Sequence, residues 1–366
     1  MRKLSVFLIL INLICCVVGE EEFVASTEKL TPKFIFLFIG DGMGETHPLL
    51  AQHTMQQEDS FAKINFLEFP IQLKTRVHSA DKAIPDSAAG ATAIACGVKT
   101  NNGNIGVDAE GNVVESIVEL AKKRNRKVGF ISSTNINNHT IAAFTSHYVK
   151  PQGFYAFGID MINADIDFIS GGDFLGHTVP NKKRLYDYAE ERGYTILRNL
   201  KQINELNVAE GDKIIATVPR RMEYNRHPRY GDVAMADLVQ FGIDFLMNEE
   251  GFLLVVEGGL IEINSHTNQS ASVVGEMVEF NNAVNTAFDF VKRFPQNSLI
   301  IITADHETGD LQTTDNRNFY WKSYGNSGKN IITYIYGAKQ ESFVPENGNV
   351  IDNTDIAKKL KEIIQE

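Results

Sequence analysis

The chain has 366 residues, a formal net charge of −11 and a hydrophobic fraction of 43%. This length and apolar content suit one large or two modest domains with an ample core. The acidic balance argues against nucleic acid as a partner.

The N-terminus is typical of a secretory signal peptide. Met1-Arg2-Lys3 precedes an apolar run from Leu4 to Val18, and Gly19 is followed by three glutamates. This pattern predicts cleavage near Gly19, and the apolar run is too short to span a membrane comfortably. We therefore expect a signal peptide over 1–19 and a secreted or periplasmic mature chain over 20–366, with no transmembrane segment.

The three cysteines fall into two groups. Cys15 and Cys16 leave with the expected signal peptide, so Cys96 remains alone and the mature chain has no intrachain disulfide. A lipid anchor on Cys15 or Cys16 is a minor alternative, because Ile14 stands where the cleavage pattern requires a small residue. Cys96 is expected to be a small buried apolar residue without a catalytic role.

Apolar, β-rich runs alternate with helical stretches along the mature chain. Runs that are apolar throughout suit strands buried on both faces. The alternation predicts an α/β fold with a mainly parallel central sheet and helices on both faces. We expect one catalytic domain with a surface insertion around 180–230, where basic clusters occur with little periodicity. The expected strands are 34–39, 128–132, 252–256, 299–303 and 331–336, and the expected helices include 113–124, 270–294 and 354–365.

A serine stands at the start of an alanine-rich helical segment. Asp86-Ser87 precedes the run from Ala88 to Ala93. The N–H groups and the dipole at a helix start favour an anion such as phosphate, which makes Ser87 a candidate nucleophile. Asp-Ser before alanines is equally a good helix cap. The choice between these two interpretations depends on the rest of the chain.

Polar side chains follow three of the predicted strands where each strand ends. Asp41 follows the first strand, Glu257 follows the strand 252–256, and Asp305-His306 follows the strand 299–303. Ligand sites in such sheets lie at the carboxyl ends of the strands. Carboxylates and an imidazole brought together there are a typical set of metal ligands. The sequence therefore predicts a metal site at this edge of the sheet.

A second metal site is predicted a few residues beyond Glu257. Glu262 and His266 are four residues apart and point the same way if the segment is helical. Each of these features taken singly has an ordinary explanation, since a strand-end Asp is often a cap and an exposed Glu or His is usually solvated. Several such features after buried strands favour a site.

These residues resemble the motifs of the alkaline phosphatase family, and the resemblance runs from about Phe34 to Gly337. Its motifs occur in the family's order, which makes the match specific. They are Ile39-Gly40-Asp41-Gly42-Met43-Gly44, the Ser87 segment, Gly97-Val98-Lys99-Thr100, Ile105-Gly106-Val107-Asp108, Thr140 before Ala142-Ala143-Phe144 and His147, Glu257-Gly258, and Thr303-Ala304-Asp305-His306-Glu307-Thr308-Gly309.

The resemblance implies a secreted metal-dependent phosphomonoesterase that hydrolyses small phosphate monoesters through a phosphoserine at Ser87. It implies an alkaline phosphatase-like sandwich fold. It also implies a homodimer, because members of the family generally form homodimers. It also implies three metal ions: a zinc on Asp41, Asp305 and His306, a second zinc on Glu262 and His266, and a magnesium on Asp41, Thr140 and Glu257.

Four positions depart from the family pattern. Asn326 stands at the place of a third zinc-binding histidine, so it is a weak candidate ligand, and the second site should bind zinc less well or prefer Mg²⁺, Mn²⁺ or Ca²⁺. Pro151 replaces an arginine that grips phosphate. Lys150 could supply the positive charge without the planar, bidentate geometry of an arginine, or it could be an ordinary solvent-exposed lysine. Glu262 replaces Asp, and Asn138 replaces Asp or His near the magnesium.

Two other functions stay open at this point. One is a degenerate relative that binds metal or phosphate with little turnover, which Asn326 and Pro151 favour. The other is a phosphodiesterase or sulfatase on the same fold, which is less favoured because the resemblance is specifically to the serine-helix motif of the monoesterases.

Overall fold

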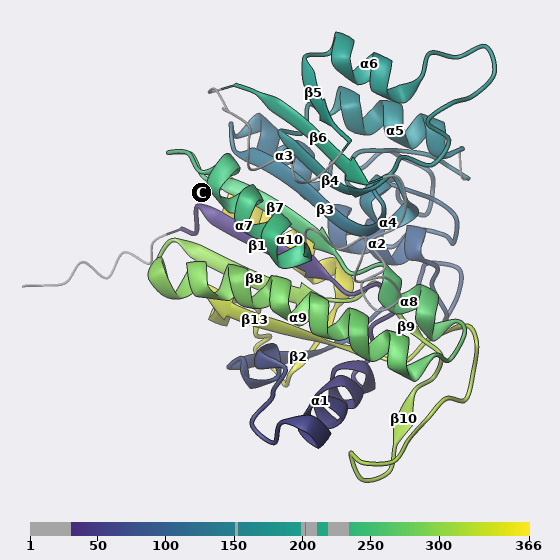
Figure 1. Ribbon diagram of the computed structural model, residues 1–366, viewed down its shortest axis with the longest axis vertical. Coiled ribbons are helices and arrows are strands. Elements are labelled where there is room, and N and C mark those ends of the chain that lie inside the picture. The colour runs from purple at the N-terminus through teal and green to yellow at the C-terminus, as the bar shows by residue number, and fades with distance from the viewer. Residues whose placement is uncertain (1–30, 151–152, 199–201, 203–210, 219–233) are drawn as a thin grey trace, which may run out of the picture.

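The computed structural model describes residues 31–150, 153–198, 202, 211–218 and 234–366 (Figure 1). The expected signal peptide over 1–19 and the departure at Pro151 lie outside the described residues. Within the described part of the chain, no helix is long and apolar enough to cross a membrane.

A ten-stranded sheet forms the centre of the molecule, with the order β14-β2-β13-β8-β1-β7-β3-β4-β6-β5. Neighbouring strands run parallel, except that β13 is antiparallel to both β2 and β8. The mainly parallel sheet predicted from the sequence is therefore confirmed. Its strands are β1 (Phe34–Ile39), β2 (Ile71–Arg76), β3 (Lys127–Asn135), β4 (Phe168–Gly172), β5 (Tyr194–Leu197), β6 (Lys213–Val218), β7 (Phe252–Glu257), β8 (Ser298–Thr303), β13 (Ile331–Gly337) and β14 (Val350–Asp352).

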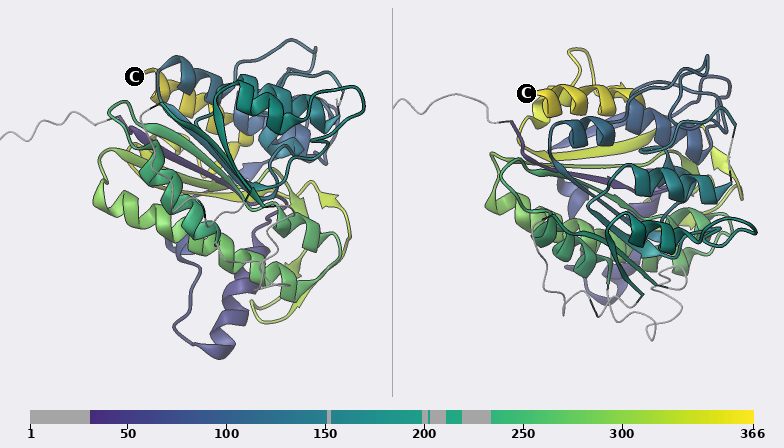
Figure 2. Two further views of the ribbon diagram at one scale, coloured as in Figure 1. Left: turned by 45° about the horizontal axis from the view of Figure 1, so that its top comes forward. Right: turned by 90° about the horizontal axis from the view of Figure 1, so that it is seen from above.

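Helices cover both faces of this sheet (Figure 2). Side chains of β1 alternate between the two faces, as expected for a strand: Leu37 packs in the core under α2, α3 and α10, whereas Phe36 packs in the core under α7 and α9. Both cores are made of apolar side chains, and every residue of β1, β7 and β8 is buried. The helices are α1 (Thr46–Glu58), α2 (Ser87–Cys96), α3 (Ile117–Lys123), α5 (Phe154–Asn163), α6 (Leu185–Glu191), α7 (Met235–Leu246), α9 (Ser270–Arg293) and α10 (Asn353–Gln365), with 3-10 turns η1 (Asn65–Glu68) and η3 (Gln340–Phe343).

The predicted elements are present, and they differ from the structure mainly at their ends. The helix expected from 113 begins only at Ile117. Ser116 ends the preceding loop with a capping box, in which its hydroxyl accepts from the Glu119 N–H and the Glu119 carboxylate accepts from the Ser116 N–H. Such a box fixes a helix start, which explains the later beginning.

The described parts of the stretch around 180–230 contain α6, β5 and β6. Strands β6 and β5 continue the main sheet beyond β4 and form its last two positions. These residues thus extend one edge of the sheet, and the division of the chain into one domain with an insertion stays a prediction.

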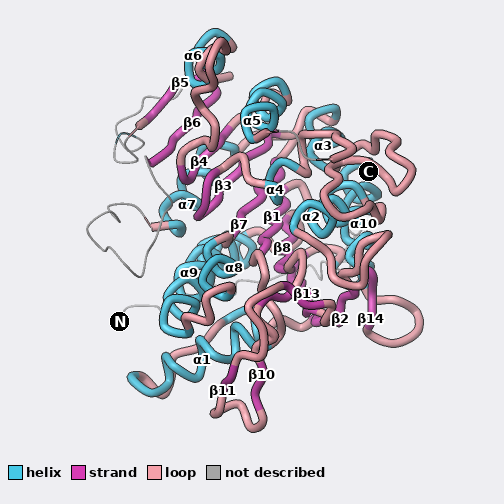
Figure 3. Tube along the Cα trace, turned by 90° about the vertical axis from the view of Figure 1, so that its right-hand side faces the viewer, coloured by secondary structure: helices cyan, strands magenta, loops and turns pink. Residues whose placement is uncertain are grey.

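Short elements follow the carboxyl ends of the central strands. They are α4 (His139–Ala142) after β3, α8 (Leu260–Ser265) after β7, and, after β8, the pairs β9 (Glu307–Thr308) with β12 (Asn326–Ser327) and β10 (Gln312–Thr313) with β11 (Phe319–Tyr320). Figure 3 shows α2, α4 and α8 grouped around the ends of β1, β3 and β7. Because β1 pairs in register with β7 and β8, Ile39 lies beside Glu257 and Thr303. The polar residues that follow these strands are therefore neighbours.

Candidate active site

Ser87 is the first residue of α2, and the helix is capped by its neighbour. The Asp86 carboxylate accepts a hydrogen bond from the Ala89 N–H at 2.9 Å, which is the role of an N-cap residue. Ser87 is thereby free of capping, and its Oγ lies 3.3 Å from Nε2 of His306. Asp86 is therefore the helix cap, and Ser87 remains the candidate nucleophile. The two interpretations of the sequence apply to different residues of the Asp86-Ser87 pair.

The small residues of α2 let it approach the end of β8 closely. A Cβ atom built on Gly90 would lie 2.6 Å from the backbone oxygen of Asp305. No larger residue fits there, since such a contact is far inside van der Waals distance. The alanine- and glycine-rich segment is thus what brings Ser87 to the strand-end residues.

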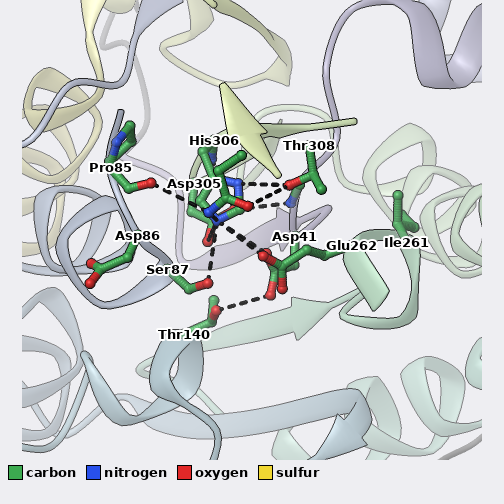
Figure 4. Close-up of polar contacts among 12 residues, drawn as sticks. Asp41, Pro85, Asp86, Ser87, Thr140, Ile261, Glu262, Asp305, His306 and Thr308 are labelled. Atoms are coloured by element: carbon green, nitrogen blue, oxygen red, sulfur yellow. Dashed lines mark hydrogen bonds and ion pairs between the residues drawn. The ribbon is translucent and has the colours of Figure 1, made fainter. Parts of the chain in front are cut away.

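Asp41, Asp305 and His306 form a buried cluster beside Ser87 (Figure 4). One ligand atom from each of the three lies within 4.8 Å of the others. Nε2 of His306 lies 3.4 Å from Oδ2 of Asp305 and 3.7 Å from Oδ1 of Asp41. Two carboxylates and an imidazole that face one point are a set of donors suited to a divalent cation such as zinc.

Some carboxylate oxygens of the site are not satisfied by hydrogen bonds from the described residues. Oδ1 of Asp41 and Oδ2 of Asp305 are buried and accept no hydrogen bond from the described residues, and the same holds for Oε1 of Glu257. Burial, with the Asp305 charge next, raises the pKa of Asp41 well above its ordinary value, and burial also raises the pKa of Asp305. Buried carboxylate oxygens without donors are costly. The residues present therefore fit a bound cation, which would satisfy these oxygens.

Glu257 lies at the end of β7 in an oxygen-rich surrounding. The Ser132 hydroxyl donates to its Oε2 at 2.5 Å, and the Asn138 amide donates to the same atom at 2.6 Å. Burial raises the pKa of Glu257 to about 7, although these donors favour its charged form. Close by, the Thr140 hydroxyl lies 3.4 Å from Oδ2 of Asp41. A set of hard oxygen atoms of this kind suits magnesium.

Glu262 and His266 meet at the end of α8, as the four-residue spacing predicts. Oε1 of Glu262 lies 3.2 Å from Nε2 of His266 and 3.5 Å from Nε2 of His306. Burial alone would raise the pKa of Glu262, but the hydrogen bond from His266 and the charge of that histidine hold it below its ordinary value. The hydrogen bond to Glu262 in turn raises the pKa of His266. Nδ1 of His266 lies 2.5 Å from the Tyr324 carbonyl oxygen.

Asn326 reaches the same place from the β9–β12 pair. Its strand runs antiparallel to β9, with Asn326 opposite Thr308. This pairing sets Nδ2 of Asn326 3.1 Å from Nε2 of His306. The structure thus brings together Ser87 and the residues predicted as metal ligands, which are Asp41, Thr140, Glu257, Glu262, His266, Asp305, His306 and Asn326.

Lys150 is the remaining residue that the sequence predicts for the site. Its side chain is exposed, and its backbone N–H donates to Oδ1 of Asn104 at 3.1 Å. Within the described residues its ammonium group makes no hydrogen bond or ion pair. Its role in substrate binding stays a prediction.

Sequence analysis missed two polar residues that contact the site. Ser132, which binds Glu257, is the last residue of the predicted strand 128–132, so the strand-end rule would have found it. Thr308 bonds to both His306 and Asn326. It belongs to a recognised motif, but a threonine at this position has no distinctive spacing, so no signal in the sequence pointed to its contacts.

The fold and the site together define an α/β protein with a serine at a helix start beside a buried carboxylate–imidazole cluster. A family model described as alkaline phosphatase matches residues 32–155 and 176–365. The chain belongs to the alkaline phosphatase family.

Individual relatives are distant. The chain is 28% identical over 315 residues to alkaline phosphatase 4 of Bacillus subtilis, a match that covers 82% of this chain and 67% of that protein. It is also 28% identical over 304 residues to an alkaline phosphatase of Schizosaccharomyces pombe, covering 76% of this chain and 56% of that one. The chain thus spans between about half and two thirds of the length of these relatives.

Solved structures show a similar fold over nearly the whole chain. The alkaline phosphatase from the Antarctic bacterium TAB5 superposes with a TM-score of 0.79 at 26% identity, covering 92% of this chain and 98% of that chain. A variant of the TAB5 enzyme, with Mg bound in its M3 site, superposes with a TM-score of 0.78 at 27% identity, covering 92% and 99%. The expected alkaline phosphatase-like sandwich is therefore confirmed.

Proposed function

We propose that this protein is a metal-dependent phosphomonoesterase that hydrolyses phosphate monoesters through a phosphoserine at Ser87. The observation that carries the proposal is the position of the Ser87 hydroxyl, 3.3 Å from Nε2 of His306, in a cluster where two buried carboxylate oxygens accept no hydrogen bond from the described residues. A serine hydroxyl is a poor nucleophile until a base or a cation takes up its charge. Family membership supports the same reaction.

We propose three cation sites in this arrangement. Cations bound there would lower the pKa of the serine hydroxyl and of an attacking water and would neutralise charge on the phosphoryl group. The Mg bound in the TAB5 variant supports a metal requirement in this fold. The proposed ligands are Asp41, Asp305 and His306 for one zinc, Glu262 and His266 for a second zinc or a harder ion, and Asp41, Thr140 and Glu257 for magnesium.

The chain's own groups supply the rest of the chemistry. The first turn of α2 directs backbone N–H groups and the positive end of its dipole toward a phosphate on Ser87. In the first step the Ser87 oxygen bonds to phosphorus and the ester oxygen leaves. In the second, a water oxygen bonds to phosphorus, the serine oxygen leaves, and inorganic phosphate is released.

The setting of this activity is also proposed from the sequence. The signal-like segment over 1–19 supports export, and the acidic balance supports small phosphate esters as partners in place of nucleic acid. A homodimer is proposed from the family resemblance alone.

Hydrolysis of p-nitrophenyl phosphate tests the proposal. The protein is stripped of metal and refilled separately with Zn²⁺, Mg²⁺, Mn²⁺ or Ca²⁺, with the variant Ser87→Ala as the control. We expect turnover that returns with metal and is lost in Ser87→Ala. Turnover that is unchanged in Ser87→Ala would contradict the assignment of the nucleophile.

A second candidate function is a relative that binds phosphate or metal with little turnover. The neutral amide at Asn326 favours it, because an amide is a weak zinc ligand. A folded protein that binds phosphate but shows no turnover with any of the four ions would support this candidate. Parallel assays with a phosphodiester and a sulfate ester separate the remaining alternative, a diesterase or sulfatase.

A further inference from the structure

Thr308 joins His306 and Asn326 through one hydroxyl group. Its Oγ1 lies 3.2 Å from Nδ1 of His306 and 3.1 Å from Oδ1 of Asn326. On the other side of this small network, Nδ2 of Asn326 lies 3.1 Å from Nε2 of His306 and 3.4 Å from the Pro85 carbonyl oxygen. The three side chains thus form a closed ring of contacts beside Ser87.

The directions of the hydrogen bonds follow from the number of protons available. A threonine hydroxyl has a single proton, and here it is donated to the carbonyl oxygen of Asn326. Thr308 therefore accepts from Nδ1–H of His306. The imidazole then carries its lone pair on Nε2, the atom that lies 3.4 Å from Oδ2 of Asp305 and 3.7 Å from Oδ1 of Asp41, so this nitrogen is unprotonated as in a metal-binding histidine.

The Pro85 carbonyl oxygen selects which end of the Asn326 amide faces the site, because a carbonyl oxygen only accepts and therefore favours the NH₂ end, which leaves Oδ1 to accept from Thr308. The NH₂ group therefore points toward Nε2 of His306 and Pro85. An NH₂ group only donates hydrogen bonds, so it cannot ligate a cation. In this orientation Asn326 is not the counterpart of a metal-binding histidine.

Close packing holds Thr308 in place. Thr308 is fully buried, and a Cβ atom built on Gly42 would lie 2.8 Å from its Oγ1. The neighbouring Glu307 is also buried, and it accepts a hydrogen bond from Ser327, the residue that follows Asn326. The loop after β1 thus holds Thr308 in place, and the β9–β12 pair holds Thr308 beside Asn326.

The NH₂ group and the candidate nucleophile share one neighbour, the imidazole of His306. Nε2 of His306 has Nδ2 of Asn326 at 3.1 Å and Oγ of Ser87 at 3.3 Å. A phosphoryl group on Ser87 brings negatively charged oxygens to this place. A donor directed at such oxygens forms a charge-assisted hydrogen bond, which is stronger than a neutral one.

We propose that Asn326 binds the phosphoryl group of the substrate through its NH₂ group and holds no metal ion, with Thr308 as the positioning residue for this amide. The proposal deepens the proposed phosphomonoesterase function and rests on it. It assigns a phosphate-binding donor on β12.

Equilibrium binding of inorganic phosphate to the metal-loaded chain tests the proposal, together with metal content measured by mass spectrometry. Asn326→Asp keeps the size of the side chain and replaces the donor by an acceptor. Asn326→Ala removes both groups. Asn347→Asp adds the same charge at an exposed asparagine in the loop before β14 and serves as the matched control.

We expect Asn326→Asp and Asn326→Ala to weaken phosphate binding by roughly ten- to a hundredfold, the loss typical of a hydrogen bond to a charged group, while metal content per chain stays unchanged. Asn347→Asp should leave both quantities as they are. Thr308→Val should weaken phosphate binding without loss of metal, and Thr308→Ser should restore most of it because the hydroxyl returns.

Two results would overturn the proposal. One is loss of about one metal ion per chain in Asn326→Ala with retention in Asn326→Asp, which would make Asn326 a ligand. The other is phosphate binding that is unchanged in both variants. Since phosphate binding at equilibrium requires no turnover, this test is separate from the p-nitrophenyl phosphate assay, and either proposal can fail while the other stands.

Discussion

The candidate site has two halves that are built differently. The inner half, made of Asp41, Asp305 and His306, follows the central strands and is buried, with a His306 side chain of zero exposure. The outer half, made of Glu262, His266 and Asn326, comes from α8 and β12, and the His266 side chain is 41% exposed.

The halves also differ in how their polar atoms are satisfied. Asp41 and Asp305 each keep a buried oxygen without a donor among the described residues, whereas Glu262 is paired with His266 and Asn326 is bound by Thr308. The inner half is thus unfavourable without a cation, and the outer half is satisfied by its own contacts. This difference suggests that the inner half determines metal dependence and that the outer half tunes the reaction.

The largest expected effect is seen in two single variants, one that removes the histidine of the inner half and one that removes the histidine of the outer half. We expect His306→Ala to lower kcat/KM for p-nitrophenyl phosphate by about a thousandfold or more, because it removes a buried ligand beside Ser87. His266→Ala should lower it by roughly ten- to a hundredfold. Equal losses in the two variants would break the distinction between the halves.

A pH effect on the stability of the metal-free protein comes next. The pKa of Glu257 is about 7 in the folded chain, above its ordinary value of 4.5, because the group is buried. The folded state therefore binds more protons than the unfolded state between these values, and the free energy of unfolding falls as pH rises through this window. We expect a loss of up to about 3 kcal/mol between pH 4.5 and pH 7.5.

Chemical denaturation at several pH values, with and without added metal, measures this effect. Saturating metal should reduce the loss, because a cation stabilises the charged carboxylates. Stability of the metal-free protein that rises with pH over the same window would contradict the conclusion that burial raises the pKa of Glu257.

A smaller effect is expected at Asn138, which donates to Glu257 at 2.6 Å. Asn138→Asp replaces that donor by a second carboxylate, so the metal-free protein should lose about 1–3 kcal/mol of stability at neutral pH. Affinity for Mg²⁺ should rise, as measured by calorimetry. If neither quantity changes relative to Asn347→Asp, the contact between Asn138 and Glu257 has no energetic weight.

The smallest effect is expected at Lys150. Its exposed side chain makes no ion pair with the described residues, and exposed charges contribute little. Lys150→Ala should raise KM for p-nitrophenyl phosphate by less than about threefold, when measured at constant ionic strength. A tenfold rise would show that Lys150 contacts the substrate after all.

The inner half could be predicted from the sequence because it depends on a general rule. Parallel strands in register place Asp41, Glu257 and Asp305 at one edge of the sheet, and buried apolar strands are easy to recognise. The burial of Cys96 was expected on similar grounds. Its pKa is raised to about 12 by burial, which fits an unreactive thiol.

The outer half could be predicted only in part. The spacing of Glu262 and His266 showed that they share a face, but the orientation of the Asn326 amide depends on Pro85 and Thr308, whose contacts no spacing reveals. The edge strands β5 and β6 were missed because they have only four and six residues, too few to show a clear period. The orientation of the amide and the pairing of the edge strands depend on contacts between residues far apart in the sequence, which local patterns do not reveal.

The most direct test of the proposed phosphoserine is to look for phosphate on the protein while it is mixed with substrate. The metal-loaded chain is mixed with p-nitrophenyl phosphate, quenched with acid and digested, and its peptides are analysed by mass spectrometry. We predict a phosphate on Ser87 that is absent in Ser87→Ala and in metal-free protein. Rapid hydrolysis in which no phosphate appears on Ser87 at any time of quenching would contradict the account.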